Sequence, residues 1–140
     1  FGEISISDLK RFLTEKGIVI RSNDKLIKFW KGMKKNSDGL VPAITIDSVT
    51  KEVLMMAYMS YEAFELTSNT GFMHYYSRSR KAMWKKGESS GHIQRVIEGR
   101  IDCDRDTLLY EVEQTGAACH TNNKSCFYTK LDDWDGESVE

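Results

Sequence analysis

The sequence predicts a single α+β domain, in which short N-terminal helices precede a largely antiparallel, strongly curved and barrel-like sheet. Apolar residues at helical spacing lie mainly before residue 71, whereas alternating apolar and polar residues dominate the rest of the chain. The 140 residues contain no repeat, low-complexity tract or linker, so we assign residues 1–140 to one domain with its own core.

Two short helices are expected before the first strand. The first begins at Ser7-Asp8 and stops at Gly17, inside a helical N-terminal extension that we assign to residues 1–23. The second is amphipathic, and its apolar face consists of Leu26, Phe29 and Trp30. At the other end of the chain, the acidic segment 132–140 is expected to form a frayed tail.

The later elements are mainly strands. Apolar or alternating runs predict strands at residues 43–47, 53–59, 72–77, 92–101, 108–114 and 126–131. A third helix should begin at Tyr61, after the N-cap Ser60, and end before Gly71. His74 is expected to be a packed, hydrogen-bonded core residue. The methionines expected to fill the core are Met55, Met56 and Met59.

Composition favours a cytoplasmic protein that binds neither nucleic acid nor a membrane. The formal net charge of -1 provides no basic field, and no apolar run approaches the roughly 20 residues that span a bilayer. The N-terminus lacks the basic and apolar regions of a signal peptide. Three cysteines without a C-x-x-C motif favour free thiols or metal ligands, and their odd number leaves room for a site completed by a second subunit.

The segment Asp102-Cys103-Asp104-Arg105-Asp106 combines two kinds of metal ligand. In an extended strand its aspartates would share one face and suit a hard ion such as Mg2+, while the Cys103 thiol on the other face would suit Zn2+. A flat strand would spread the aspartates over about 13 Å, too far for one magnesium ion. The chain should therefore bend or bulge here, or one carboxylate should act through water. An exposed acidic strand face is the alternative.

A basic stretch, residues 77–91, carries five basic residues between Arg78 and Lys86 with no acidic residue among them. Arginine side chains and backbone N–H groups near glycine bind phosphate oxygens, and Trp84 could stack on a base. The candidate substrate-binding residues are Ser77, Arg78, Ser79, Arg80, Trp84, Lys86 and Ser90. A solvated basic loop is the alternative reading of this stretch.

Eight collinear motifs together resemble the phosphoribosyl-AMP cyclohydrolase family. They are GLVPA (39–43), EVLMMAYM (52–59), TG (70–71), YSRSR (76–80), WKKGESSGH (84–92), DCDRD (102–106), GAACHT (116–121) and SCF (125–127). The resemblance covers about residues 24–131, and the chain before it matches nothing comparable in the family.

The resemblance implies hydrolysis of the N1–C6 bond of the adenine ring in phosphoribosyl-AMP, a step of histidine biosynthesis, by a homodimer. It also implies zinc held between the two chains by Cys103, Cys119 and Cys126, and magnesium held by Asp102, Asp104 and Asp106. Three protein ligands would leave zinc a position for water, whose pKa falls to about 7. His120 and His92 are the candidates for proton transfer, and a structural role for His120 remains open.

Two other functions compete with this interpretation. A zinc nucleobase deaminase would carry the signature H-x-E…P-C-x-x-C, which is absent, and Pro42 lies far from any cysteine. A zinc-stabilised nucleotide- or RNA-binding module without catalysis could use Trp84 and the basic stretch. The near-neutral net charge and the three aspartates count against polyanion binding.

Overall fold

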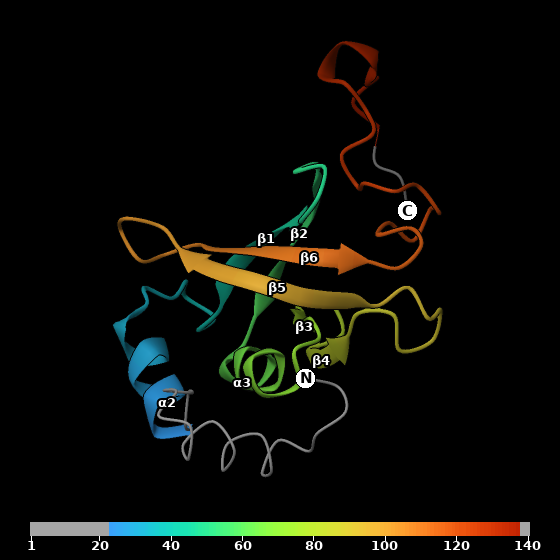
Figure 1. The fold of residues 1–140 in the computed structure, drawn as a ribbon. Coiled ribbons are helices and arrows are strands. Elements are labelled where there is room, and N and C mark those ends of the chain that lie inside the picture. Colours follow the sequence, from blue (N-terminus) through green and yellow to red (C-terminus); the bar gives the residue numbers. More distant parts are fainter. Residues whose placement is uncertain (1–22, 138–140) are drawn as a thin grey trace.

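The computed structural model describes residues 23–137, and the helix predicted from Ser7-Asp8 to Gly17 lies outside this range (Figure 1). The elements in chain order are α2 (Asn23–Gly32), β1 (Val41–Asp47), β2 (Val53–Met59), α3 (Tyr61–Thr70), β3 (His74–Ser77), β4 (Ala82–Lys85), β5 (Gln94–Ile101), β6 (Leu108–Gln114) and a 3-10 turn, η1 (Leu131–Asp133). Within residues 23–137, no helix is long and apolar enough to cross a membrane.

The six strands form one strongly curved sheet in the order β4-β3-β2-β1-β6-β5. Strands β1 and β6 pair in parallel, and the other neighbours are antiparallel. Figure 1 shows the β5–β6 hairpin crossing β1 and β2 at a steep angle, so the sheet wraps into half a barrel. The predicted α+β architecture with a largely antiparallel, curved sheet is therefore confirmed.

Helix α3 closes one side of the half-barrel and begins and ends where predicted. The Ser60 hydroxyl accepts a hydrogen bond from the backbone N–H of Ala63 at 3.2 Å, which satisfies a free donor of the first turn. Gly71 ends the helix in the left-handed conformation, with φ 79°. Trp30 of α2 packs against Phe64 of α3 with ring centroids 5.6 Å apart, so both helices share one apolar contact.

The core joins α2 and α3 to the concave side of the sheet. It contains Leu26, Val41, Leu54, Met55, Met59, Phe64, Met73, Tyr75, Leu108, Tyr110 and Val112, among others. Burying an apolar side chain of this size contributes about 1.5–3 kcal/mol. The prediction for Met55 and Met59 is confirmed, whereas Met56 was wrongly placed in the core. Met56 is 44% exposed because β2 presents alternate side chains to its outer face.

One predicted strand is absent from the structure, and one observed strand was not predicted. Residues 126–131 form no strand, because the backbone N–H of Cys126 donates to the Leu54 carbonyl at 2.7 Å but no ladder follows. Conversely, Ala82–Lys85 forms β4, although its basic surroundings indicated a loop. Strand β4 is at the edge of the sheet, where charged side chains can remain in water.

Glu111 is a buried acid on β6 that neutralises two basic side chains. Its carboxylate accepts hydrogen bonds from Lys51 and, at 2.5 Å, from Arg100. The side chain of Glu111 is only 7% exposed. The hydrogen bonds from Lys51 and Arg100 lower the pKa of Glu111 to about 2. The ion pairs tie β5 and the β1–β2 turn to the central strand β6.

Replacing Glu111 with glutamine should lower the melting temperature at neutral pH and have little effect below about pH 2. The folded-state pKa is below the unfolded value of 4.5, so the ionised carboxylate stabilises the fold above that value. This contribution is lost as the pH falls from 4.5 to about 2. Thermal unfolding of wild type and Glu111→Gln across this pH range measures the difference between their melting temperatures. If that difference stays constant with pH, Glu111 has a packing role only.

Candidate active site

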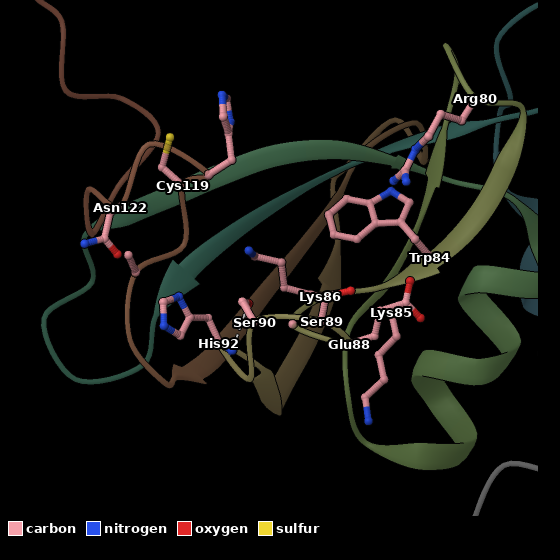
Figure 2. A pocket seen from close by; sticks show the side chains of 13 residues that line it. Arg80, Trp84, Lys85, Lys86, Glu88, Ser89, Ser90, His92, Cys119 and Asn122 are labelled. Atoms are coloured by element: carbon pink, nitrogen blue, oxygen red, sulfur yellow. Dashed lines mark hydrogen bonds between the residues drawn. The ribbon is translucent and has the colours of Figure 1, made fainter.

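A pocket of about 380 Å³ lies between the loop that follows β4 and the loop that follows β6. Its walls consist of Arg80, Trp84, Lys85, Lys86, Gly87, Glu88, Ser89, Ser90, His92, Ala117, Cys119, His120 and Asn122. Figure 2 shows Arg80 beside Trp84 at one end and Cys119, Asn122 and His92 at the other, with Lys86 between them. The pocket therefore joins cationic groups, an aromatic ring, a thiol and two imidazoles.

The first wall is a tight loop, residues 86–93, held by two glycines and a serine. Gly87 has φ 83°, and a Cβ there would lie 2.5 Å from the backbone carbon of His92. The Ser90 hydroxyl accepts a hydrogen bond from the backbone N–H of His92 at 3.1 Å. These contacts fold the loop back on itself and bring Ser90 and His92 to the pocket.

The second wall is the cysteine loop, residues 115–126. A Cβ on Gly116 would lie 2.5 Å from the His92 ring, so the missing side chain lets the two loops touch. The backbone N–H of Cys119 donates to the Asn123 carbonyl at 3.1 Å. At the far end, the Ser125 hydroxyl donates to the Val53 carbonyl at 2.7 Å. The loop is thereby fixed to both the first wall and β2.

Two of the three thiols meet in this loop. Burial alone would raise the pKa of Cys119, but hydrogen bonds from Thr121 and Cys126 lower it below its usual value. The Thr121 hydroxyl donates to the Cys119 sulfur at 3.0 Å. Burial and the neighbouring Cys119 raise the pKa of Cys126 to about 11. Of the two thiols, Cys119 therefore has the lower pKa.

Lys86 brings a positive charge close to these sulfurs. Burial lowers the pKa of Lys86, and the opposing effect of Cys126 and Cys119 is smaller. Trp84 on β4 forms the neighbouring wall and packs on Tyr75 with ring centroids 5.2 Å apart. Strand β4, which the sequence pattern did not reveal, thus aims Trp84 into the pocket and positions the lysines that follow it.

A second hollow, of about 430 Å³, adjoins the first and shares Arg80 and Trp84 with it. The β3–β4 turn forms its rim, where the backbone N–H of Arg80 donates to the Ser77 hydroxyl at 3.2 Å. The guanidinium of Arg78 stacks on the Tyr58 ring, 4.1 Å from its centroid. The second hollow is also lined by Met56, Ala57, Tyr76, Ser77 and Ser79.

The three aspartates occupy a turn between β5 and β6, so the chain bends here, which is one of the alternatives that the sequence left open. One carboxylate oxygen from each of Asp102, Asp104 and Asp106 lies within 4.8 Å of the others. Arg105 adopts φ 66°, which lets the chain fold back. Asp102 also accepts a hydrogen bond from the backbone N–H of Asp106 at 2.9 Å.

This crowding separates the acidities of two carboxyl groups. Desolvation raises the pKa of Asp102, but hydrogen bonds from Asp106, Asp104 and Thr107 lower it overall. Hydrogen bonds to Asp102 and Asp106, together with their charges, raise the pKa of Asp104. Three closely spaced carboxylate oxygens are the ligands that a small hard cation prefers.

Cys103 lies in the same acidic turn, away from the other two cysteines. Strand β6 separates the turn from the cysteine loop by about 20 Å, and Figure 1 shows them at opposite ends of the β5–β6 hairpin. Among residues 23–137, the aspartate group is the one set of three or more His, Cys, Asp or Glu side chains close enough to hold a metal. One chain therefore does not bring its three cysteines together.

All seven predicted substrate-binding residues line the two adjoining hollows, and both candidate catalytic histidines line the first. Three residues of the site were not predicted from the sequence: Asn122 and Glu88, which line the first pocket, and Tyr58, which supports Arg78. The polar turn between Cys119 and Cys126 was the available signal for Asn122. His74 is a buried residue as predicted, with its Nδ1 2.8 Å from the Phe72 carbonyl, and burial lowers its pKa.

The chain is similar to known proteins over most of its described part. The family model of phosphoribosyl-AMP cyclohydrolase matches residues 55–128. A phosphoribosyl-AMP cyclohydrolase of Archaeoglobus fulgidus is 65% identical over 94 residues, which cover 67% of this chain and 87% of the relative. Those of Methanoregula boonei and Haloquadratum walsbyi are 60% and 63% identical, over 71% and 69% of this chain and 81% and 74% of the relatives. The chain therefore belongs to the phosphoribosyl-AMP cyclohydrolase family of enzymes.

Proposed function

We propose that the protein hydrolyses the N1–C6 bond of the adenine ring in phosphoribosyl-AMP, as a cytoplasmic enzyme of histidine biosynthesis. The pocket that joins the Cys119–Cys126 pair to His92, His120 and Lys86 is the observation that carries the proposal. It places metal-binding sulfur, proton carriers and cationic groups around one space large enough for a nucleobase. Family membership favours this enzyme over a zinc-stabilised binding module without catalysis.

Zinc is proposed to bind Cys119 and Cys126 of one chain and Cys103 of a second. Soft sulfur ligands suit Zn2+, and the hydrogen bond between Cys119 and Cys126 places two sulfurs side by side. When bound, zinc would lower the pKa of water and supply the nucleophile. For zinc to take part in catalysis, its fourth coordination position must be free of any protein ligand.

The residues of the pocket then handle the substrate and its protons. The oxygen of water forms a bond to C6, the N1–C6 bond breaks, and N1 receives a proton. His120 follows a proposed zinc ligand directly and is the first candidate to accept the proton from water or deliver it to N1. His92 faces the same pocket and is the second candidate. Trp84 offers a flat surface on which a base can stack.

The acidic turn is proposed to bind Mg2+ and to complete the site of the partner chain. Carboxylate oxygens from Asp102, Asp104 and Asp106 are near enough to share one cation. Because Cys103 is in the same turn, a partner that supplied its sulfur would also bring these aspartates. The pocket wall is basic at Arg80, Lys85 and Lys86, so the two surfaces have opposite charge.

A steady-state assay with phosphoribosyl-AMP tests the proposed function. Ring opening should proceed with the metal-loaded protein, stop after chelation and return when zinc and magnesium are restored. Binding of phosphoribosyl-AMP without turnover by the metal-loaded protein would instead favour the non-catalytic binding module.

The basic side chains of the two hollows are proposed to hold the phosphates of the substrate. Arg78→Ala and Arg80→Ala should each lower kcat/KM by roughly 10- to 150-fold, because a charge-assisted contact is worth about 1.5–3 kcal/mol. Lys81→Ala is the matched control, since Lys81 lies in the same turn but lines neither hollow. Steady-state kinetics on the three variants measure the effect. An equal kcat/KM in all three would make the turn a solvated basic loop.

A further inference from the structure

A continuous chain of side-chain hydrogen bonds runs from the core to the active-site loops. It begins at Thr45 on β1 and Tyr75 on β3, whose hydroxyl oxygens are 2.7 Å apart. The Tyr75 hydroxyl donates to Gln94 Oε1 at 2.6 Å. On β5, Gln94 Nε2 donates to Gln114 Oε1 at 2.7 Å. Thr45, Tyr75 and Gln94 are fully buried, so no water competes for these bonds.

All of these bonds point in one direction. Burial raises the pKa of Tyr75, so its hydroxyl stays protonated and donates a hydrogen bond to Gln94. The Thr45 hydroxyl must then be the donor to Tyr75. Each amide of the chain accepts through oxygen and donates through nitrogen, and bonds arranged in this way polarise and strengthen one another.

The chain ends on the backbone of both pocket walls. Gln114, the last residue of β6, donates through Nε2 to the carbonyl of His92 at 3.2 Å and to that of Thr115 at 2.9 Å. The same nitrogen is 3.4 Å from the carbonyl of Ile93. The first wall holds His92, and the second continues from Thr115 through Gly116 to Cys119.

We propose that Gln114, oriented by Gln94, is a positioning residue that sets the distance between His92 and the cysteine loop for the reaction. This inference rests on the proposed function. Gln114 donates to two carbonyls in different loops at once, beside the backbone bond from the N–H of Thr115 to the Ile93 carbonyl at 3.0 Å. Because small displacements of reacting groups lower the rate strongly, the effect should fall on kcat more than on KM.

The decisive variant is Gln114→Met, which keeps the length of the side chain and removes its donor and acceptor. It should lower kcat by about 10- to 100-fold while KM changes by less than about 3-fold. Gln114→Glu is the second variant, because it still accepts from Gln94 but has no donor for the carbonyls when ionised. Gln114→Glu should show the same loss of kcat, and it provides the test if Gln114→Met does not fold.

Glu111→Gln is the control for stability alone, since Glu111 is on the same strand but belongs neither to the hydrogen-bond chain nor to a pocket wall. It should lower the melting temperature but leave kcat within about 3-fold of wild type. The inference is overturned if Gln114→Met keeps wild-type kcat, or if all variants lose kcat in proportion to their melting temperatures. Failure of the wild-type protein to turn over phosphoribosyl-AMP would instead refute the proposed function.

Discussion

Mixing Cys103→Ala protein with Cys126→Ala protein should restore activity to about a quarter of wild type, although each variant alone is inactive. The reason is the proposed division of the zinc ligands between two chains. If Cys103 comes from one chain and Cys119 with Cys126 from its partner, each symmetric dimer holds two such sites. A mixed dimer then has one site that lacks both replaced ligands and one intact site.

Random exchange of subunits makes about half of the dimers mixed, and one of the two sites in each is active. The measurement is the phosphoribosyl-AMP turnover rate after the chains have been unfolded together and refolded. Mixing Cys119→Ala with Cys126→Ala is the matched control, because both replacements fall in the same half of the site and cannot complement. If subunits exchange but the first mixture also stays inactive, the ligands are not divided between chains.

Cys119→Ser combined with Cys126→Ser should remove zinc, which we expect at about one ion per chain, and lower the turnover rate by more than about 100-fold. The physical reason is that both sulfurs contributed by one chain are lost together. Elemental analysis of the purified protein measures the metal, and the phosphoribosyl-AMP assay measures the rate.

Thr121→Val is the appropriate control for that double variant. It removes the hydroxyl that donates to the Cys119 sulfur but keeps both sulfurs. The protein should retain zinc, with affinity reduced by about 10- to 100-fold at most. Full zinc occupancy in the double variant would contradict the assignment of the metal site.

Elements with a clear local signal were predicted with accurate ends. Ser60 and Gly71 mark the two ends of α3 because capping and left-handed backbone are properties of single residues. Strand β6 was predicted at its observed bounds, Leu108–Gln114, since the apolar Tyr110 and Val112 alternate with the charged Glu111 and Glu113. Strand β4 was missed because an edge strand needs little apolar pattern.

The site was predicted by residue type more reliably than by conformation. The aspartate motif indicated a cation site, and its spacing left open a bend, a bulge or a carboxylate that acts through water. Only the structure shows a turn with Arg105 at positive φ. Residues 126–131 alternate like a strand, yet their backbone makes no ladder of hydrogen bonds after Cys126. The role of Gln114 depends on carbonyls contributed by two separate loops, and no local sequence pattern indicates that these loops lie side by side.

If two chains share the proposed zinc site, the position of Cys103 at the opposite end of β6 from Cys119 has a genetic consequence. Consider a cell that makes the normal protein and a form without Cys126. Each mixed dimer would keep one working site, so the total activity would be about halfway between those of the two pure forms. A form without both Cys103 and Cys126 would inactivate both sites of every mixed dimer. Such an allele would be dominant over the normal one, even though each replacement alone is not.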